Sequence, residues 1–186
     1  MVSVHPDQYE NFIFDFDGTL LNLDVEWARL REEVAQEFPL GRSAEHDGFT
    51  TLVDWIVRRK GADGRAKVAK IIKKYEQPAG RIRISRINER VVEFASKLSN
   101  FYVISNNLNS TITAGIAFLN IGTRCRQVIG FDDVLRSKPN EEPYKKLCSL
   151  HPLSGRTVYI GDRDTDLEFA KKLRIDFIST KDIEDI

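Results

Sequence analysis

Short apolar runs, each followed by polar residues, recur along this chain of 186 residues. Runs of this kind, bounded by turn residues, are typical of buried strands. Helix-period segments separate the later runs. Strands that alternate with helices indicate an α/β fold, in which a Rossmann-like parallel sheet carries helices on both faces. The predicted strands lie at residues 12–16, 101–105, 127–130, 157–160 and 176–179, and the apolar positions of the helices between the later ones at 112–119, 144–148 and 167–173.

The interval from about residue 22 to residue 84 breaks this alternation, because it contains several helical patterns and no convincing strand. We expect an α/β core domain of residues 1–21 and 85–186 and an inserted all-helical cap domain of residues 22–84. A helix from about residue 85 to residue 98 would return the chain to the core. Turn residues at 39–41, 61–64 and 78–80 mark the loops of the cap.

The insert leaves the core after the first strand and returns before the second. It is therefore placed to close over the strand ends as a lid, which would exclude water and help to select the substrate. A rigid helical module that never moves is the alternative.

Two carboxylates, Asp15 and Asp17, follow the first predicted strand and precede Gly18. Two acids this close repel each other unless a cation or a shared proton intervenes, and their oxygens suit Mg²⁺. Ligands of parallel sheets bind beyond the carboxyl ends of the strands, where this pair would lie. An ordinary polar turn would use the same residue types, so the pair alone leaves both interpretations open.

Three later loops add polar side chains of matching chemistry. Ser105 and Asn106 follow the second predicted strand and offer a hydroxyl and an amide to phosphate oxygens, although a loop with a helix cap would look the same. Lys138 could neutralise phosphoryl charge, although a lone lysine is usually on the surface. Asp162 and Asp166 follow the strand at 157–160; helix capping does not require Asp162, which with Asp15 and Asp17 supplies oxygen ligands for Mg²⁺.

Charge and composition restrict the partners. Lysine plus arginine equals aspartate plus glutamate, 28 each, so no net field favours nucleic acid or an anionic membrane. The chain has no apolar run of membrane-spanning length and no leader pattern at its start, which predicts a cytoplasmic protein. Eight basic residues lie between 58 and 74. They either draw anions to the site or form the solvent-exposed face of an amphipathic helix, and we favour the exposed face.

The four polar loops together resemble the haloacid dehalogenase (HAD) superfamily of phosphohydrolases. The motifs occur in the family's order, and the insert lies where one subfamily, which includes phosphoglycolate phosphatase-like enzymes, carries a helical cap. The resemblance implies a Mg²⁺-dependent phosphatase that hydrolyses a small soluble phosphomonoester through an aspartyl-phosphate. The matching residues are Asp15-Phe16-Asp17-Gly18-Thr19, Ser105-Asn106, Lys138-Pro139 and Gly161-Asp162-Arg163-Asp164-Thr165-Asp166.

The resemblance also assigns roles to these residues. It makes Asp15 the nucleophile and Asp17 the acid that protonates the leaving oxygen and then activates water. Mg²⁺ would be held by Asp15, the backbone carbonyl of Asp17, and Asp162, with Asp166 supporting the site from behind. Phosphoryl oxygens would be oriented or neutralised by Thr19, Ser105, Asn106 and Lys138.

Other reactions use the same fold. A phosphomutase or phosphotransferase would need the same residues, and a non-catalytic phosphate-binding regulatory protein would keep the fold without turnover. Asp17 argues against a dehalogenase or a pump ATPase of the superfamily, and the motif order argues against a receiver domain. We expect a small phosphorylated metabolite as the ligand, with no nucleic acid and no membrane as partners; the identity of that metabolite and the oligomeric state stay open.

Overall fold

The structure of the protein is a computed structural model that describes residues 6–38, 48–76 and 84–183. Five parallel strands form the central sheet in the order β5-β4-β1-β6-β7, with β1 in the middle. All five strands were predicted from the apolar runs, with ends that differ by at most two residues. Their bounds are β1 Asn11–Phe14, β4 Phe101–Ile104, β5 Cys125–Ile129, β6 Thr157–Gly161 and β7 Asp176–Ser179.

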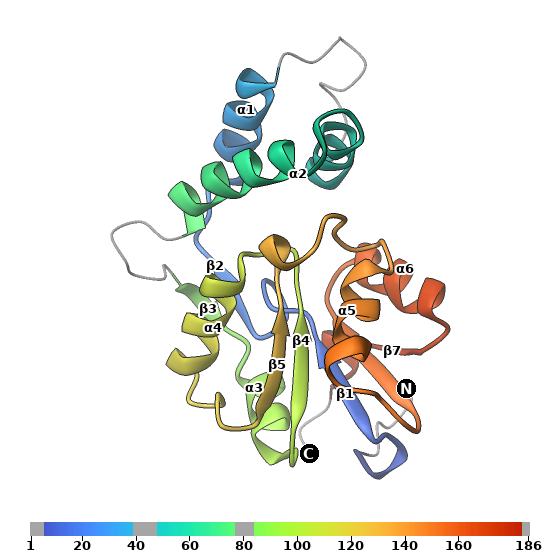
Figure 1. Ribbon diagram of the computed structural model, residues 1–186. Helices are drawn as coiled ribbons and strands as arrows, with labels where there is room; N and C mark the ends of the chain where they lie inside the picture. Colours follow the sequence, from blue (N-terminus) through green and yellow to red (C-terminus); the bar gives the residue numbers. More distant parts are fainter. Residues whose placement is uncertain (1–5, 39–47, 77–83, 184–186) are drawn as a thin grey trace.

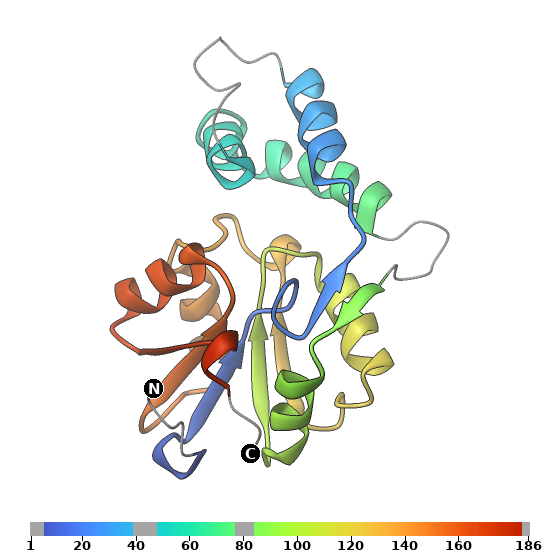
Figure 2. The same cartoon turned by 180° about the vertical axis from the view of Figure 1, so that it is seen from behind.

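Helices cover both faces of this sheet (Figures 1 and 2). Successive side chains of a strand point to opposite faces, so Phe12 and Phe14 enter one hydrophobic cluster and Ile13 the other. The Phe12 cluster contains α3 (Glu89–Lys97) and α4 (Asn109–Phe118), and the Ile13 cluster contains α5 (Glu142–Leu150) and α6 (Asp164–Leu173). This layering confirms the predicted α/β fold class. Short 3₁₀ turns lie at Pro6–Gln8, Phe131–Asp133 and Thr180–Asp182.

A helical cap stands over the carboxyl ends of β1 and β4 (Figure 1). It consists of α1 (Trp27–Glu37) and α2 (Phe49–Glu76), which is interrupted where Gly61 adopts a φ of 58°. This break falls in the predicted turn at 61–64, whereas the predicted loops at 39–41 and 78–80 lie outside the described residues. The cap has its own apolar centre, which includes Leu30, Val34, Leu52, Ile56, Val68 and Ile72.

The base of the cap contains a two-stranded antiparallel ribbon that the sequence did not predict. β2 (Leu21–Leu23) pairs with β3 (Ile84–Ile87), so the expectation of no strand from 22 to 84 is wrong at both ends. The helix expected from residue 85 begins at Glu89 instead. Both strands are short, and each is specified by a partner about sixty residues away, so neither carries a local periodic signal. The predicted domain boundaries at 21/22 and 84/85 fall inside this ribbon and stay predictions.

Within the described ranges, no helix combines the length and the apolar character needed to cross a membrane.

Candidate active site

Asp15 lies directly beyond the end of the central strand β1. Its backbone N–H donates to the carbonyl oxygen of Ile160 at 2.8 Å, which continues the pairing between β1 and β6. The side chain is only 5% exposed. Burial raises the pKa of Asp15 to about 6, and the adjacent Lys138 ammonium opposes this shift. The end of β1 therefore places a buried carboxylate beside a cation that favours its ionised form.

Lys138 provides that cation from the loop between β5 and α5. Its Nζ donates to Asp15 Oδ1 at 2.8 Å, to Asp166 Oδ1 at 2.6 Å and to the Tyr159 hydroxyl at 2.6 Å, which uses all three ammonium protons. Burial alone would lower the pKa of Lys138, but the charges and hydrogen bonds of Asp15 and Asp166 raise it. Tyr159 donates onward to the carbonyl oxygen of Ile104 at 2.7 Å. The ammonium is consequently charged and held in one position.

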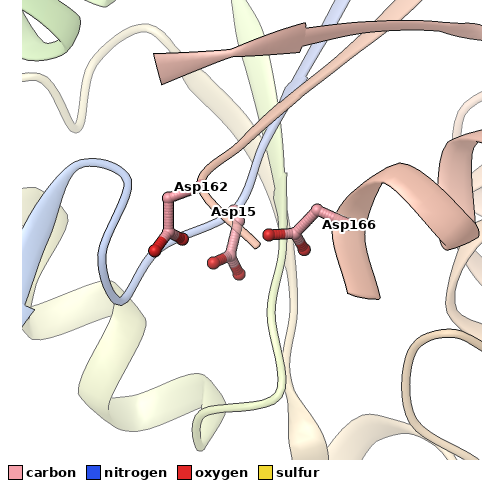
Figure 3. A group of neighbouring side chains, drawn as sticks. All are labelled: Asp15, Asp162 and Asp166. Carbon is pink, nitrogen blue, oxygen red and sulfur yellow. The ribbon is translucent and has the colours of Figure 1, made fainter. Parts of the chain in front are cut away.

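Three carboxylates lie close together (Figure 3), and two of them, those of Asp15 and Asp166, pair with this lysine. Asp15, Asp162 and Asp166 each place an oxygen within 4.8 Å of the others, and the described residues offer no second group of this kind. Burial raises the pKa of Asp162, the Arg163 charge opposes this shift, and the charge of Asp166 adds to it. Carboxylate oxygens at such spacing fit a hard cation such as Mg²⁺. Asp166, placed behind the site by the resemblance, belongs to this cluster and is also paired with Lys138.

The Asp17 carboxylate is held by different partners. Its Oδ1 accepts the backbone N–H of Leu23 in β2 at 2.8 Å, and its Oδ2 accepts from Arg163 at 3.4 Å. Burial raises the pKa of Asp17, although these two donors lower it. Gly18, with a φ of 93°, makes the turn that follows, as expected from its place after the acid pair. A Cβ at Gly18 would lie 2.4 Å from Asp162 Oδ2, so the close approach of these two loops depends on glycine.

The other predicted site residues divide into two groups. Ser105 and Asn106 line the same cavity as Asp15 and Lys138. Asn106 also holds the lysine loop through two hydrogen bonds with the Lys138 backbone, at 3.0 and 3.1 Å. Thr19 is fully buried, and its hydroxyl donates to Asp162 Oδ1 at 3.3 Å. The hydroxyl of Thr19 therefore contacts the acid cluster, and its expected contact with a phosphoryl group stays a prediction.

The cavity has a volume of about 360 Å³ and lies between cap and core. The core supplies its charged floor, and the cap supplies Trp27, Phe49 and Thr50. Such a space, with convergent polar groups on one wall and apolar groups on the other, is typical of a site for a small ligand. The described lining from the core comprises Asp15, Asp17, Ser105, Asn106, Asn107, Lys138, Arg163, Thr165 and Asp166.

One residue that touches the site indirectly, Glu76, was missed in the sequence. This last residue of α2 is 1% exposed, and it accepts hydrogen bonds from Asn107 Nδ2 at 2.9 Å and from the Leu108 N–H at 3.0 Å. Asn107 in turn accepts the Ser105 hydroxyl at 2.9 Å. Burial raises the pKa of Glu76 to about 7. Its place at the end of an apolar stripe was the only signal, and exposed glutamates share that pattern.

Arg65 is a second cap residue that reaches the core. It is buried, donates to the carbonyl oxygen of Phe131 at 2.6 Å and to Ser137 Oγ at 2.6 Å, and lies over the Phe131 ring. The other basic residues of its stretch behave as predicted, since Lys67, Lys70 and Lys74 are exposed. Composition could not single out Arg65, because its burial depends on where α2 meets the core.

Comparison with known proteins shows the family of this chain. The sequence profile described as "Haloacid dehalogenase-like hydrolase" matches residues 12–180. A curated relative, phosphoglycolate phosphatase of Pectobacterium atrosepticum, is 24% identical over 173 residues, which span 85% of this chain and 74% of that protein.

Solved structures share the fold at low sequence identity. A protein of Lactobacillus plantarum proposed to be a phosphoglycolate phosphatase matches with a TM-score of 0.60 and 16% identity, over 96% of this chain and 89% of its own. A HAD-superfamily hydrolase of subfamily IA from Geobacter sulfurreducens has a TM-score of 0.53 and 13% identity, over 96% and 90%. YfnB of Bacillus subtilis, described as a HAD-hydrolase bound to magnesium with interdomain movement, has a TM-score of 0.52 and 15% identity, over 91% and 87%. From the profile match over nearly its whole length, together with this fold, the chain belongs to the haloacid dehalogenase-like hydrolase family.

Proposed function

We propose that this protein is a Mg²⁺-dependent phosphatase that hydrolyses a small phosphomonoester through an aspartyl-phosphate on Asp15. The observation that carries the proposal is the contact between Asp15 and Lys138 at the floor of the cavity, with Asp17 on the same lining. A nucleophile, a fixed positive charge and a second carboxylate are the three groups that this chemistry needs.

Two displacements complete the reaction. In the first, an Asp15 oxygen attacks phosphorus, the bond to the alcohol oxygen breaks, and that oxygen takes the proton of Asp17. In the second, Asp17 accepts a proton from water, the water oxygen attacks phosphorus, and the bond to Asp15 breaks to release phosphate. The raised pKa of Asp17 suits this alternation between acid and base.

The chain's own residues would hold the cofactor and the phosphoryl group. Asp15, Asp162 and the backbone carbonyl of Asp17 are the proposed Mg²⁺ ligands, and the convergence of Asp15 with Asp162 supports this assignment. The bound cation would neutralise charge on the transferring group. Asp166 would hold Lys138, which with Ser105 and Asn106 would contact phosphoryl oxygens. Thr19, whose hydroxyl contacts Asp162, is assigned to the same group.

The substrate is assigned as a small phosphorylated metabolite, because the cavity between cap and core holds about 360 Å³. The relatives named as phosphoglycolate phosphatases support the phosphatase reaction. We assign the cap the role of a lid, in keeping with the interdomain movement described for YfnB.

The test is phosphate release from a panel of phosphorylated metabolites, with Mg²⁺ or with a chelator. We expect release that requires Mg²⁺ and that is lost in Asp15→Asn. The matched control is Asp164→Asn, which makes the same exchange at an exposed position of α6. Release that continues in a folded Asp15→Asn protein would contradict the assignment of the nucleophile.

A further inference from the structure

The cap forms the part of the cavity wall that faces the acidic floor. Its contribution consists of two aromatic side chains, Trp27 and Phe49, and the hydroxyl residue Thr50. The two rings lie 6.4 Å apart between centroids with an interplanar angle of 51°. Both residues are half-buried, since they pack on the apolar centre of the cap and leave the rest of their surface to the cavity. The wall opposite the phosphate site is thus aromatic.

The charged groups on the described lining all come from the core. There are three acids, Asp15, Asp17 and Asp166, and two cations, Lys138 and Arg163. All three protons of the Lys138 ammonium already have acceptors. Arg163 lies between two acids, 3.4 Å from Asp17 Oδ2 and 3.7 Å from Asp162 Oδ2. Both cations of the described lining are therefore already paired with acids of the core, and the cap contributes no cation to it.

We propose that the substrate is a phosphomonoester whose alcohol carries an uncharged planar ring, which packs against Trp27 and Phe49. The faces of aromatic rings are electron-rich, so they attract ring edges and stack with ring faces but offer nothing to a carboxylate. A carboxylate enclosed there without a cation would lose its hydration uncompensated. This inference deepens the proposed phosphatase function, on which it rests. It assigns this chain a different substrate from that of the relatives named for phosphoglycolate, because the organic part of phosphoglycolate carries a carboxylate.

The dimensions of the site agree with a ring-bearing substrate. Beyond Thr50 and Thr165, which line both spaces, lies a second hollow of about 390 Å³. Trp55 lines this hollow and so extends the aromatic surface of the cap. Asp54, Arg58 and Glu168 line the same hollow, so a ring that reaches past Trp27 and Phe49 meets Trp55 among polar side chains.

The first test compares benzyl phosphate with phosphoglycolate as substrates. Both are phosphate esters of primary alcohols. They differ chiefly in the group next to the CH₂, which is a phenyl ring in benzyl phosphate and a carboxylate in phosphoglycolate. We expect kcat/KM for benzyl phosphate to be higher by about tenfold or more. Trp27→Leu and Phe49→Leu should each lower this value about three- to tenfold and change phosphoglycolate turnover less than about twofold. Phe118→Leu is the matched control, because Phe118 is 62% exposed and lines a different surface of the core. Preference for phosphoglycolate, or equal losses in the control, would overturn the proposal.

The second test separates the aromatic subsite from the reaction itself. Calorimetric titration with benzylphosphonate and with phosphonoacetate, both non-hydrolysable, measures affinity in the presence of Mg²⁺. Tighter binding of benzylphosphonate, weakened by Trp27→Leu and not by Phe118→Leu, would support the aromatic subsite. If the same protein hydrolysed no ester, the phosphatase assignment would fail while the subsite would stand. Tighter binding of phosphonoacetate, or no binding of benzylphosphonate, would overturn the subsite whatever the turnover.

Discussion

The side chain of Glu76, at the end of α2, accepts a hydrogen bond of 2.9 Å from the side-chain amide of Asn107, in the loop after β4. Asn107 also accepts the hydroxyl of Ser105, so two hydrogen bonds connect the cap to a residue on the cavity lining. The same carboxyl group accepts the Leu108 N–H just before α4. The position of the cap and the orientation of Ser105 are therefore linked.

This link makes stability depend on pH. The pKa of Glu76 is about 7 in the folded protein, above its unfolded value of about 4.3, so the folded state binds the proton more tightly. Stability from this group is fully present below about pH 4 and is lost as the pH rises through 7. We expect the free energy of unfolding in urea to fall by roughly 2 kcal/mol between pH 5 and pH 8 through Glu76 alone. Glu76→Gln should remove this part of the slope; an unchanged slope would contradict it.

Removal of the buried lysine should destabilise the fold as well as stop turnover. Lys138→Met leaves Asp15 and Asp166 buried without their counter-charge, which typically costs about 3–5 kcal/mol. Urea unfolding measures the loss. Lys145→Met is the matched control, because Lys145 is 72% exposed in its pair with Glu141 and should cost less than about 1 kcal/mol. Equal losses in the two variants would show that the buried ion pairs do not stabilise the fold.

Gly18→Ala should disturb the acid cluster through the backbone. A side chain at this positive φ is strained, and its Cβ would collide with Asp162. We expect a loss of about 1–3 kcal/mol in unfolding free energy and a higher Mg²⁺ concentration for half-maximal activity. Gly48→Ala, where no atom lies within 4 Å of the added Cβ, serves as the control. A Gly18 variant with unchanged metal dependence would contradict the link between this turn and Asp162.

Asp17→Asn should slow turnover by about 10²–10⁴-fold for an alkyl ester. The amide oxygen can still accept the Leu23 N–H, so the fold should survive. Because an activated ester such as p-nitrophenyl phosphate needs little help in its first step, formation of the phosphoenzyme from it should suffer less. Pre-steady-state release of nitrophenol measures that step, and equal losses for both esters would remove Asp17 as the acid.

Local patterns predicted the parts of this molecule that are encoded locally. An apolar run with acids at its end, as from Phe12 to Asp17, specifies both a buried strand and the place where its carboxylates emerge. The pairing of Leu21 with Ile87 has no such signal, because each strand depends on a distant partner. Glu76 and Arg65 are similar, since their burial follows from how α2 lies against the core and not from the residues beside them.

The charges inside the site bear on whether the chain folds before or after it binds its metal ion. Asp15 and Asp166 share Lys138, while Asp17 and Asp162 share Arg163, so each acid of the cluster has a counter-charge from its own chain. These counter-charges offset the repulsion between the acids, although burial still raises the pKa of Asp15, Asp17 and Asp162. The newly made chain should therefore fold first and bind its cation afterwards. The metal site would then be formed before the metal arrives, and folding would not require the metal.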